Sequence, residues 1–205
     1  MIRLYRADWS TNCERVGLAL AFKGLEAESV VIDYSDRSQV ERVSGQGLVP
    51  VIETDGEVVH DSMAILRWLE DRYREPRLFP TDPARRAEID VFIDWFNEVW
   101  KGTANALEEE MERAEPDPGT VSALAATLDA RLDRFEQLLA ERDHLMGPDV
   151  TSADFIAFPF LKYARRRDPA DDELFHRLLD EHQDVRGRPR LAAWIQRVDA
   201  LPRAY

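Results

Sequence analysis

Strand signals in this chain are confined to its first 80 residues, and this division limits the folds that the chain can adopt. Residues 1–80 alternate between strand-like and helix-like patterns in the order β-α-β-α-β-β-α. From about residue 81 onward, only helical patterns remain. We therefore expect an α/β domain with a mixed sheet, followed by an all-helical bundle.

The predicted strands of the first part follow from residue type. Runs of β-branched and aromatic residues predict strands at 2–7 and 28–34. The stretch 49–60 predicts a hairpin that turns tightly at Asp55-Gly56. Amphipathic helices are expected at residues 14–25, 38–44 and 61–73.

The second part has the apolar spacing of a helical bundle. In residues 82–114 a stripe on one helix face is formed by Phe92, Phe96, Val99, Thr103 and Leu107. Further helices are predicted at residues 120–142, 152–166, 172–182 and 190–200. These patterns divide the chain into domains at 1–78 and 87–205, with residues 79–86 as the linker.

Composition excludes several functional classes. The chain has 27 basic and 40 acidic residues, and its net charge of −13 argues against a nucleic-acid or membrane surface, because phosphates bind clustered Lys and Arg. No apolar run reaches the roughly 18–20 residues that span a bilayer, and the N-terminus lacks the apolar segment of a secretory signal. The single cysteine and four scattered histidines predict neither a disulfide nor a metal site. We therefore expect a cytoplasmic protein without a bound metal.

Four separated motifs carry a family resemblance over nearly the whole chain. They are "STNCERV" at 10–16, "LVPVIE" at 48–53, "DSMAI" at 61–65 and "GPDVTSADF" at 147–155. In this order they resemble the cytosolic glutathione S-transferases, and in particular serine-type bacterial members. The resemblance implies a thioredoxin-like N-terminal domain with a four-stranded mixed sheet. It also implies glutathione as co-substrate, a small hydrophobic electrophile, a homodimer and a role in detoxification.

Two of these motifs are expected to bind glutathione through its backbone and its γ-glutamyl end. The resemblance implies a cis peptide bond at Val49-Pro50, so that the cysteinyl backbone of glutathione docks on Val49 like an added strand. The alternative is an ordinary proline at a strand start. Ser62 is expected to be the N-cap of a helix whose N-terminus suits the γ-glutamyl carboxylate, while Asp61 receives the ammonium group. The alternative for Ser62 is a helix cap alone, and the two roles are compatible.

Ser10 occupies the place that the attacking cysteine has in a dithiol motif. Its hydroxyl can donate a hydrogen bond to the sulfur of a bound thiol, which favours the thiolate. Thr11 is the alternative hydroxyl, and the spacing of Thr11 and Glu14 is that of a capping box at a helix start. Cys13 is interpreted as a small packed residue, with mixed-disulfide formation as its functional alternative. Arg15 is given a supporting structural or electrostatic role.

The fourth motif is interpreted as structural. Thr151 as N-cap and Asp154 three residues later predict a capping arrangement at a buried helix start.

The chain departs from the family pattern next to the proline. Leu48 stands where many relatives carry a Gln or Lys that reaches the glycine carboxylate, and Gln46 has the wrong spacing to replace it. For the electrophile pocket, Trp9 and Trp100 are the candidate aromatic walls. The remaining tryptophans are interpreted as core residues.

Three functions remain open at the level of the sequence. The leading one is an enzyme that stabilises the glutathione thiolate, with isomerase, peroxidase or thiol-transferase side activity. The second is a non-catalytic binding or regulatory protein on the same fold. The third is an enzyme for a different low-molecular-weight thiol. Leu48 suggests it, because leucine cannot pair with the glycine carboxylate of glutathione. The preference for Arg over Lys also suggests it, because this preference is typical of GC-rich genomes and some bacteria with such genomes use other thiols.

Overall fold

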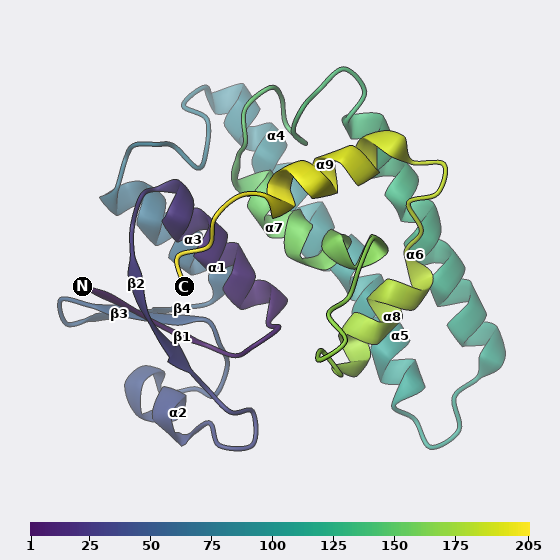
Figure 1. Cartoon of the computed structure of the whole chain (residues 1–205), viewed down its shortest axis with the longest axis horizontal. Helices are drawn as coiled ribbons and strands as arrows, with labels where there is room; N and C mark the ends of the chain where they lie inside the picture. The colour runs from purple at the N-terminus through teal and green to yellow at the C-terminus, as the bar shows by residue number, and fades with distance from the viewer. The chain divides into compact units, whose positions relative to one another are not determined.

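The computed structural model describes residues 1–205 as two compact units. Unit 1 comprises Met1–Pro80 together with Leu201–Tyr205, and unit 2 comprises Thr81–Ala200 (Figure 1). The chain therefore has an α/β unit and a helical unit, which agrees with the expected fold class. The end of the chain differs from the expectation, because its last residues belong to unit 1 rather than to the helical domain.

A four-stranded mixed sheet organises unit 1. Its strands are β1 (Ile2–Arg6), β2 (Ala27–Val31), β3 (Val51–Thr54) and β4 (Glu57–His60), in the spatial order β2-β1-β3-β4. β1 is parallel to β2 and antiparallel to β3, and β4 is antiparallel to β3. The hairpin turns at Asp55-Gly56 as predicted, with both residues at positive φ, which suits a two-residue turn.

Three helices cover the sheet: α1 (Thr11–Phe22), α2 (Ser38–Ser44) and α3 (Ser62–Arg72). Figure 1 places α1 and α3 on one side of the sheet and α2 on the other, and α1 packs on α3. Val40 of α2 packs with Tyr5 and Val51, whose side chains share one face of neighbouring strands. Leu4 and Ile52, next along these strands, are fully buried on the opposite face.

A buried ion pair joins the C-terminal ends of α1 and α3. Lys23 Nζ lies 3.0 Å from Glu70 Oε2 and also donates to the carbonyl oxygens of Tyr73 and Pro76. The same carboxylate oxygen of Glu70 accepts a hydrogen bond from the Leu78 N–H at 2.9 Å. These contacts fix the chain where it leaves α3.

The last residues of the chain pack along α1. The Ala204 N–H donates to the Gly17 carbonyl at 3.1 Å, and Arg203 forms an ion pair of 2.7 Å with Glu14. The Tyr205 ring lies against the face of Gly17, where a Cβ atom would collide with it. A glycine within this helix therefore makes room for the returning segment.

Unit 2 is all-helical. Its elements are α4 (Pro83–Asp94), a π-helical turn (Trp95–Trp100), α5 (Lys101–Met111), α6 (Pro118–Leu138), α7 (Ser152–Leu161), a 3₁₀ turn (Lys162–Ala164), α8 (Leu174–His182) and α9 (Pro189–Asp199). Asp82 caps α4 and Pro83 begins it, so the end of the predicted linker is already helix. The predicted stripe is wrong at Val99, which is 41% exposed, because Trp100 takes the buried position.

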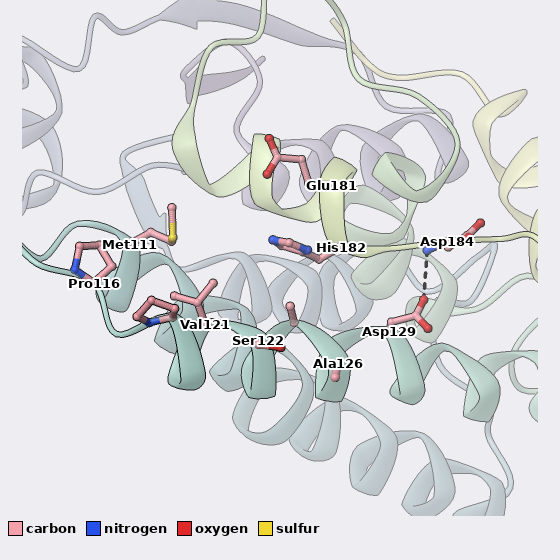
Figure 2. Close-up of a pocket in the computed structure, with 11 residues that line it drawn as sticks. Met111, Pro116, Val121, Ser122, Ala126, Asp129, Glu181, His182 and Asp184 are labelled. Carbon is pink, nitrogen blue, oxygen red and sulfur yellow. Dashed lines mark hydrogen bonds between the residues drawn. The ribbon is translucent and has the colours of Figure 1, made fainter.

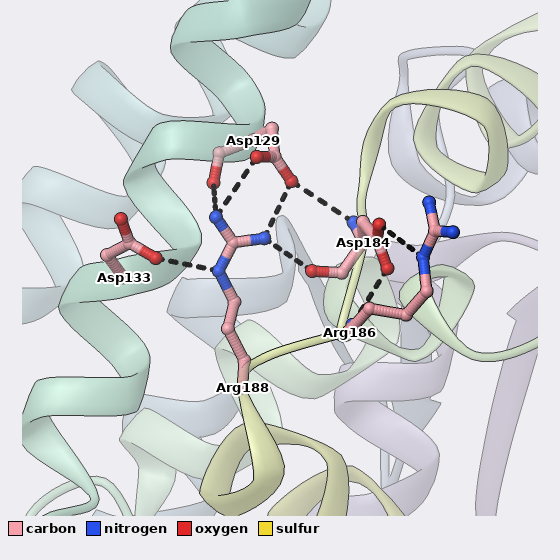
Figure 3. Close-up of polar contacts among 5 residues, drawn as sticks. All are labelled: Asp129, Asp133, Asp184, Arg186 and Arg188. Carbon is pink, nitrogen blue, oxygen red and sulfur yellow. Dashed lines mark hydrogen bonds and ion pairs between the residues drawn. The ribbon is translucent and has the colours of Figure 1, made fainter.

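Two sets of contacts made by aspartate side chains link the helices of unit 2. The predicted capping arrangement at α7 is confirmed, and the fully buried Asp154 also accepts hydrogen bonds from the Leu145 N–H and Trp194 Nε1. Burial raises the pKa of Asp154, and these donors oppose the rise. Figure 3 shows Arg188 between Asp129 and Asp133 of α6. Its Nη1 donates to Asp129 Oδ1 and its Nε donates to Asp133 Oδ1, each at 2.7 Å. Arg188 therefore ties the start of α9 to α6.

We expect the substitution Lys23→Met to lower the free energy of unfolding by about 3–5 kcal/mol, because it removes the buried cation of Glu70 and leaves only the partly exposed Arg77, at 3.9 Å, to face its charge. Chemical denaturation measures this change. The control is Arg3→Met, which removes the exposed Arg3–Glu28 pair and should cost no more than about 1 kcal/mol. Equal losses in the two variants would contradict the role assigned to Lys23.

Candidate active site

The strand register brings three motif segments to one edge of the sheet. Tyr5 near the end of β1 pairs with Val51 at the start of β3, and Val51 pairs with His60 at the end of β4. The residues that follow β1, precede β3 and follow β4 therefore emerge at the same edge. These segments carry the Ser10, Val49-Pro50 and Asp61-Ser62 motifs.

Ser10 is the N-cap of α1. Its Oγ accepts a hydrogen bond from the Cys13 N–H at 3.3 Å, and the side chain is partly exposed. Since the oxygen serves the helix as an acceptor, the hydroxyl hydrogen can be donated to another group. Thr11 is the first helical residue and is buried. The capping box expected from Thr11 and Glu14 is therefore wrong, because the cap is Ser10 and Glu14 pairs with Arg203.

Cys13 is a packed residue. Its side chain is fully buried on the first turn of α1. Burial raises the pKa of the Cys13 thiol to about 11, although the neighbouring Ser10 hydroxyl, the Ala7 backbone and Arg6 act to lower it. A protonated and buried thiol is a poor nucleophile, so the structure favours the packing interpretation over mixed-disulfide chemistry.

The Val49-Pro50 peptide bond is cis, as expected. Val49 lies outside the β3 ladder, which begins at Val51. Beside it, the Gln46 side chain accepts from the Leu48 N–H at 2.6 Å and donates to the Leu48 carbonyl at 2.9 Å. Gln46 is thus engaged within its own loop, and the Leu48 side chain is 68% exposed. Neither residue presents a cation.

The start of α3 differs from the expectation in which residue caps it. Asp61, not Ser62, is the N-cap, and it has a φ of 71°. Its Oδ1 accepts from the N–H groups of Met63 and Ala64 at 2.9 and 3.0 Å. Ser62 is instead the first helical residue. Its N–H and hydroxyl hydrogen are donors at this helix start that Asp61 does not engage.

Arg15 connects the starts of α1 and α3. Its side chain is only 2% exposed, and Nη1 donates to Asn12 Oδ1 at 3.1 Å and to Ser62 Oγ at 3.3 Å. Burial lowers the pKa of Arg15 to about 9, against the attraction of Asp61, so the guanidinium is charged at neutral pH. The sequence indicated only a supporting role. An arginine on the apolar face of the α1 pattern was the available signal.

The two candidate aromatic walls have different surroundings. Trp9 is 39% exposed, precedes Ser10 directly and has a φ of 64°. Trp100 is fully buried within unit 2, where it stacks on Phe96 at a centroid distance of 4.8 Å. This packing makes Trp100 a core residue, contrary to its expected place in a pocket wall.

Unit 2 has a separate open groove of about 720 Å³. Figure 2 shows its apolar residues, among them Met111, Pro116 and Val121, facing Glu181 and His182 of α8.

No group of three or more His, Cys, Asp or Glu side chains is arranged to hold a metal ion. None of the helices is long and apolar enough to cross a bilayer.

Comparison with known proteins agrees with this architecture. Residues 4–77 match the model of the glutathione S-transferase N-terminal domain, and residues 94–197 match that of its C-terminal domain. Protein IN2-1 homolog A of Oryza sativa subsp. japonica is 30% identical over 97% of this chain and 76% of its own length. A crystal structure of a glutathione S-transferase from Rhodospirillum rubrum F11 is 26% identical, with a TM-score of 0.77 over 98% of this chain and 88% of its own.

A thioredoxin-like unit followed by a helical unit defines the class of this protein. The chain belongs to the glutathione S-transferase family. Glutathione S-transferase theta-1 of Mus musculus is 30% identical over 78% of this chain, and this match spans 64% of the mouse protein.

We expect Cys13 to resist thiol reagents in the folded protein. With its pKa raised from 9.0 to about 11, the thiolate fraction near pH 8 is lowered about 100-fold, and burial restricts access further. Because Cys13 is the single cysteine, the chromophore that is released when a chromogenic disulfide reagent reacts with the protein reports on Cys13 alone. Reaction of the native protein as fast as of the denatured protein would contradict the packing interpretation.

Proposed function

We propose that this protein is a glutathione transferase that binds glutathione at the shared sheet edge and stabilises its thiolate for attack on a small hydrophobic electrophile. The observation that carries the proposal is the strand register, which gathers a hydroxyl donor, an open backbone segment and an acid–serine pair. The family membership supports the same chemistry. The fold itself leaves the identity of the electrophile open.

Ser10 is the proposed thiolate stabiliser. It is partly exposed and its hydroxyl hydrogen is available, whereas Thr11 is buried. Donation to sulfur favours the thiolate over the thiol, and the adjacent N-terminus of α1 adds a favourable partial charge. The thiol proton is released to water, and an electron pair of the thiolate forms the new sulfur–carbon bond. In the same step the electrophile either releases a leaving group with its bonding electrons or, in an addition, opens a π bond that takes a proton from water. Trp9 is the proposed aromatic neighbour of this reaction.

The remainder of glutathione has matching partners. The cysteinyl backbone is proposed to pair with the free edge at Val49, as an added strand would. The γ-glutamyl carboxylate is proposed to accept from the N–H and hydroxyl of Ser62. Its ammonium group is proposed to pair with Asp61, whose other carboxylate oxygen is not used in capping.

A different low-molecular-weight thiol is the second candidate co-substrate. It is favoured by the loop at residues 46–48, where Leu48 is exposed and Gln46 is held by its own backbone contacts. A thiol without a carboxylate at this end would lose nothing there, whereas the glycine carboxylate of glutathione gains no cation from this loop.

A homodimer is proposed through the exposed face of α4. A groove of about 950 Å³ lies between α4 and the C-terminal part of α6, with Val91 and Trp95 on its apolar surface. Val91 is 69% exposed, and with Phe92 and Trp95 it gives this groove a continuous apolar surface of the kind that marks protein–protein contacts. Arg85, Arg134 and Arg142 flank the groove together with Glu88, which pairs with Arg85 at 2.8 Å. In a dimer with two-fold symmetry the same face of both copies meets, so Glu88 of a second copy is the acidic group proposed to complement these arginines.

The substitution Ser10→Ala tests the proposed chemistry. We expect the pKa of the bound glutathione thiol to lie about one to two pH units higher than in the wild type, because a hydrogen bond to a charged group is worth about 1.5–3 kcal/mol. The ultraviolet absorbance of the bound thiolate, followed against pH, measures it. Transferase turnover at neutral pH should fall about 100-fold.

The matched control is Thr11→Val, which removes the adjacent, buried hydroxyl and should leave the thiol pKa unchanged. A raised thiol pKa in Thr11→Val, with none in Ser10→Ala, would transfer the role to Thr11. An unchanged pKa in both would remove the serine-type chemistry from the proposal.

We expect Val91→Arg to convert the dimer to a monomer, because it adds a cation to an apolar groove that arginines already flank. Sedimentation velocity measures the change. Met111→Arg is the control, since Met111 is also exposed in unit 2 but lines the other groove. Dissociation by Met111→Arg but not by Val91→Arg would place the interface elsewhere.

A further inference from the structure

Arg15 is a buried cation near this edge of the sheet, and the chemistry proposed above assigns no role to it. Its guanidinium lies inside unit 1, in contact with Ser62 rather than with solvent. A buried cation is costly unless its N–H groups donate hydrogen bonds to other groups of the protein. Here, the Ser62 hydroxyl oxygen accepts one of its hydrogen bonds.

The direction of this hydrogen bond determines what Ser62 can do. A guanidinium only donates, so Ser62 Oγ must be the acceptor of the 3.3 Å contact. The hydroxyl hydrogen then points away from Arg15 and is left for another acceptor. The adjacent N–H of Ser62 is a second donor that Asp61 does not engage. Two donors from one residue suit the two oxygens of a carboxylate.

We propose that Arg15 is a positioning residue that, by donating to Ser62 Oγ, turns the Ser62 hydroxyl toward the α-carboxylate of the γ-glutamyl group. The inference rests on the proposed function, since it assumes that glutathione binds at this edge. Arg15 itself does not touch the ligand. Its positive charge also offsets the negative charge of Asp61, which would otherwise repel the incoming carboxylate.

Asn12 holds Arg15 in this orientation. Its Oδ1 accepts from the same Nη1 at 3.1 Å, and its side chain is partly exposed on the first turn of α1. Arg15 thus links the helix that Ser10 caps to the helix start that carries Ser62. The specificity that follows is for a thiol with a free α-carboxylate on its γ-glutamyl end.

The test compares glutathione with γ-aminobutyryl-cysteinyl-glycine, which lacks only that carboxylate, by calorimetric titration. We expect Arg15→Gln to raise the dissociation constant for glutathione about tenfold and to leave that for the analogue unchanged. In a Ser62→Ala background, Arg15→Gln should have no further effect on glutathione binding. Arg3→Gln, which changes an exposed arginine of the same unit, is the control.

A general structural role gives a different pattern. If Arg15→Gln weakens both ligands equally, or adds its full effect to that of Ser62→Ala, the inference is wrong. Near-ultraviolet circular dichroism verifies folding. If Arg15→Gln does not fold, Asn12→Ala replaces it in the test. Asn12→Ala should produce the same carboxylate-dependent loss of affinity to a smaller degree. The absence of that loss would overturn the inference.

The proposed function and this inference fail in different ways. A wild-type protein that binds neither ligand overturns the proposed function, and the inference with it. If the wild-type protein prefers glutathione to the analogue and Arg15→Gln keeps the same preference, only the inference about Arg15 is overturned.

Discussion

The pairing of β3 with both β1 and β4 is the constraint on which the site depends. Because both pairings are antiparallel, the end of β1, the start of β3 and the end of β4 meet at one edge of the sheet. Two of these points lead into helices, so the edge also gathers the N-termini of α1 and α3. A sheet edge with two helix starts is suited to an anionic ligand even before any particular side chain is considered.

The two serines of this edge share one physical arrangement. In each, the hydroxyl oxygen accepts a hydrogen bond from inside the protein, from the Cys13 N–H for Ser10 and from Arg15 for Ser62. The hydrogen of each hydroxyl is then available to a ligand. An inward acceptor fixes the direction of an outward donor without the need for a base, which suits a site that stabilises charge on its ligand rather than generating a nucleophile of its own.

Local signals were sufficient to predict most of the helices and strands, because these depend on neighbouring residues, whereas the cis bond at Val49-Pro50 was expected only from the family resemblance. The role of a residue was harder to predict where two neighbouring residues were equally suited to the same position. Asp61 and Ser62 both favour caps, and the positive φ of Asp61 decided between them. The π-helical turn before α5 placed Trp100 rather than Val99 in the core. The contact of Arg15 with Ser62 spans 47 positions, beyond the reach of any local pattern.

The central claim is that three separate segments form a single binding site, and an amide-resolved NMR titration with glutathione tests it most directly. The account predicts that the amides of Ser10, Val49 and Ser62 shift together and give one common dissociation constant. Shifts confined to one of these segments, or centred on the unit 2 groove around Met111 and Val121, would contradict it.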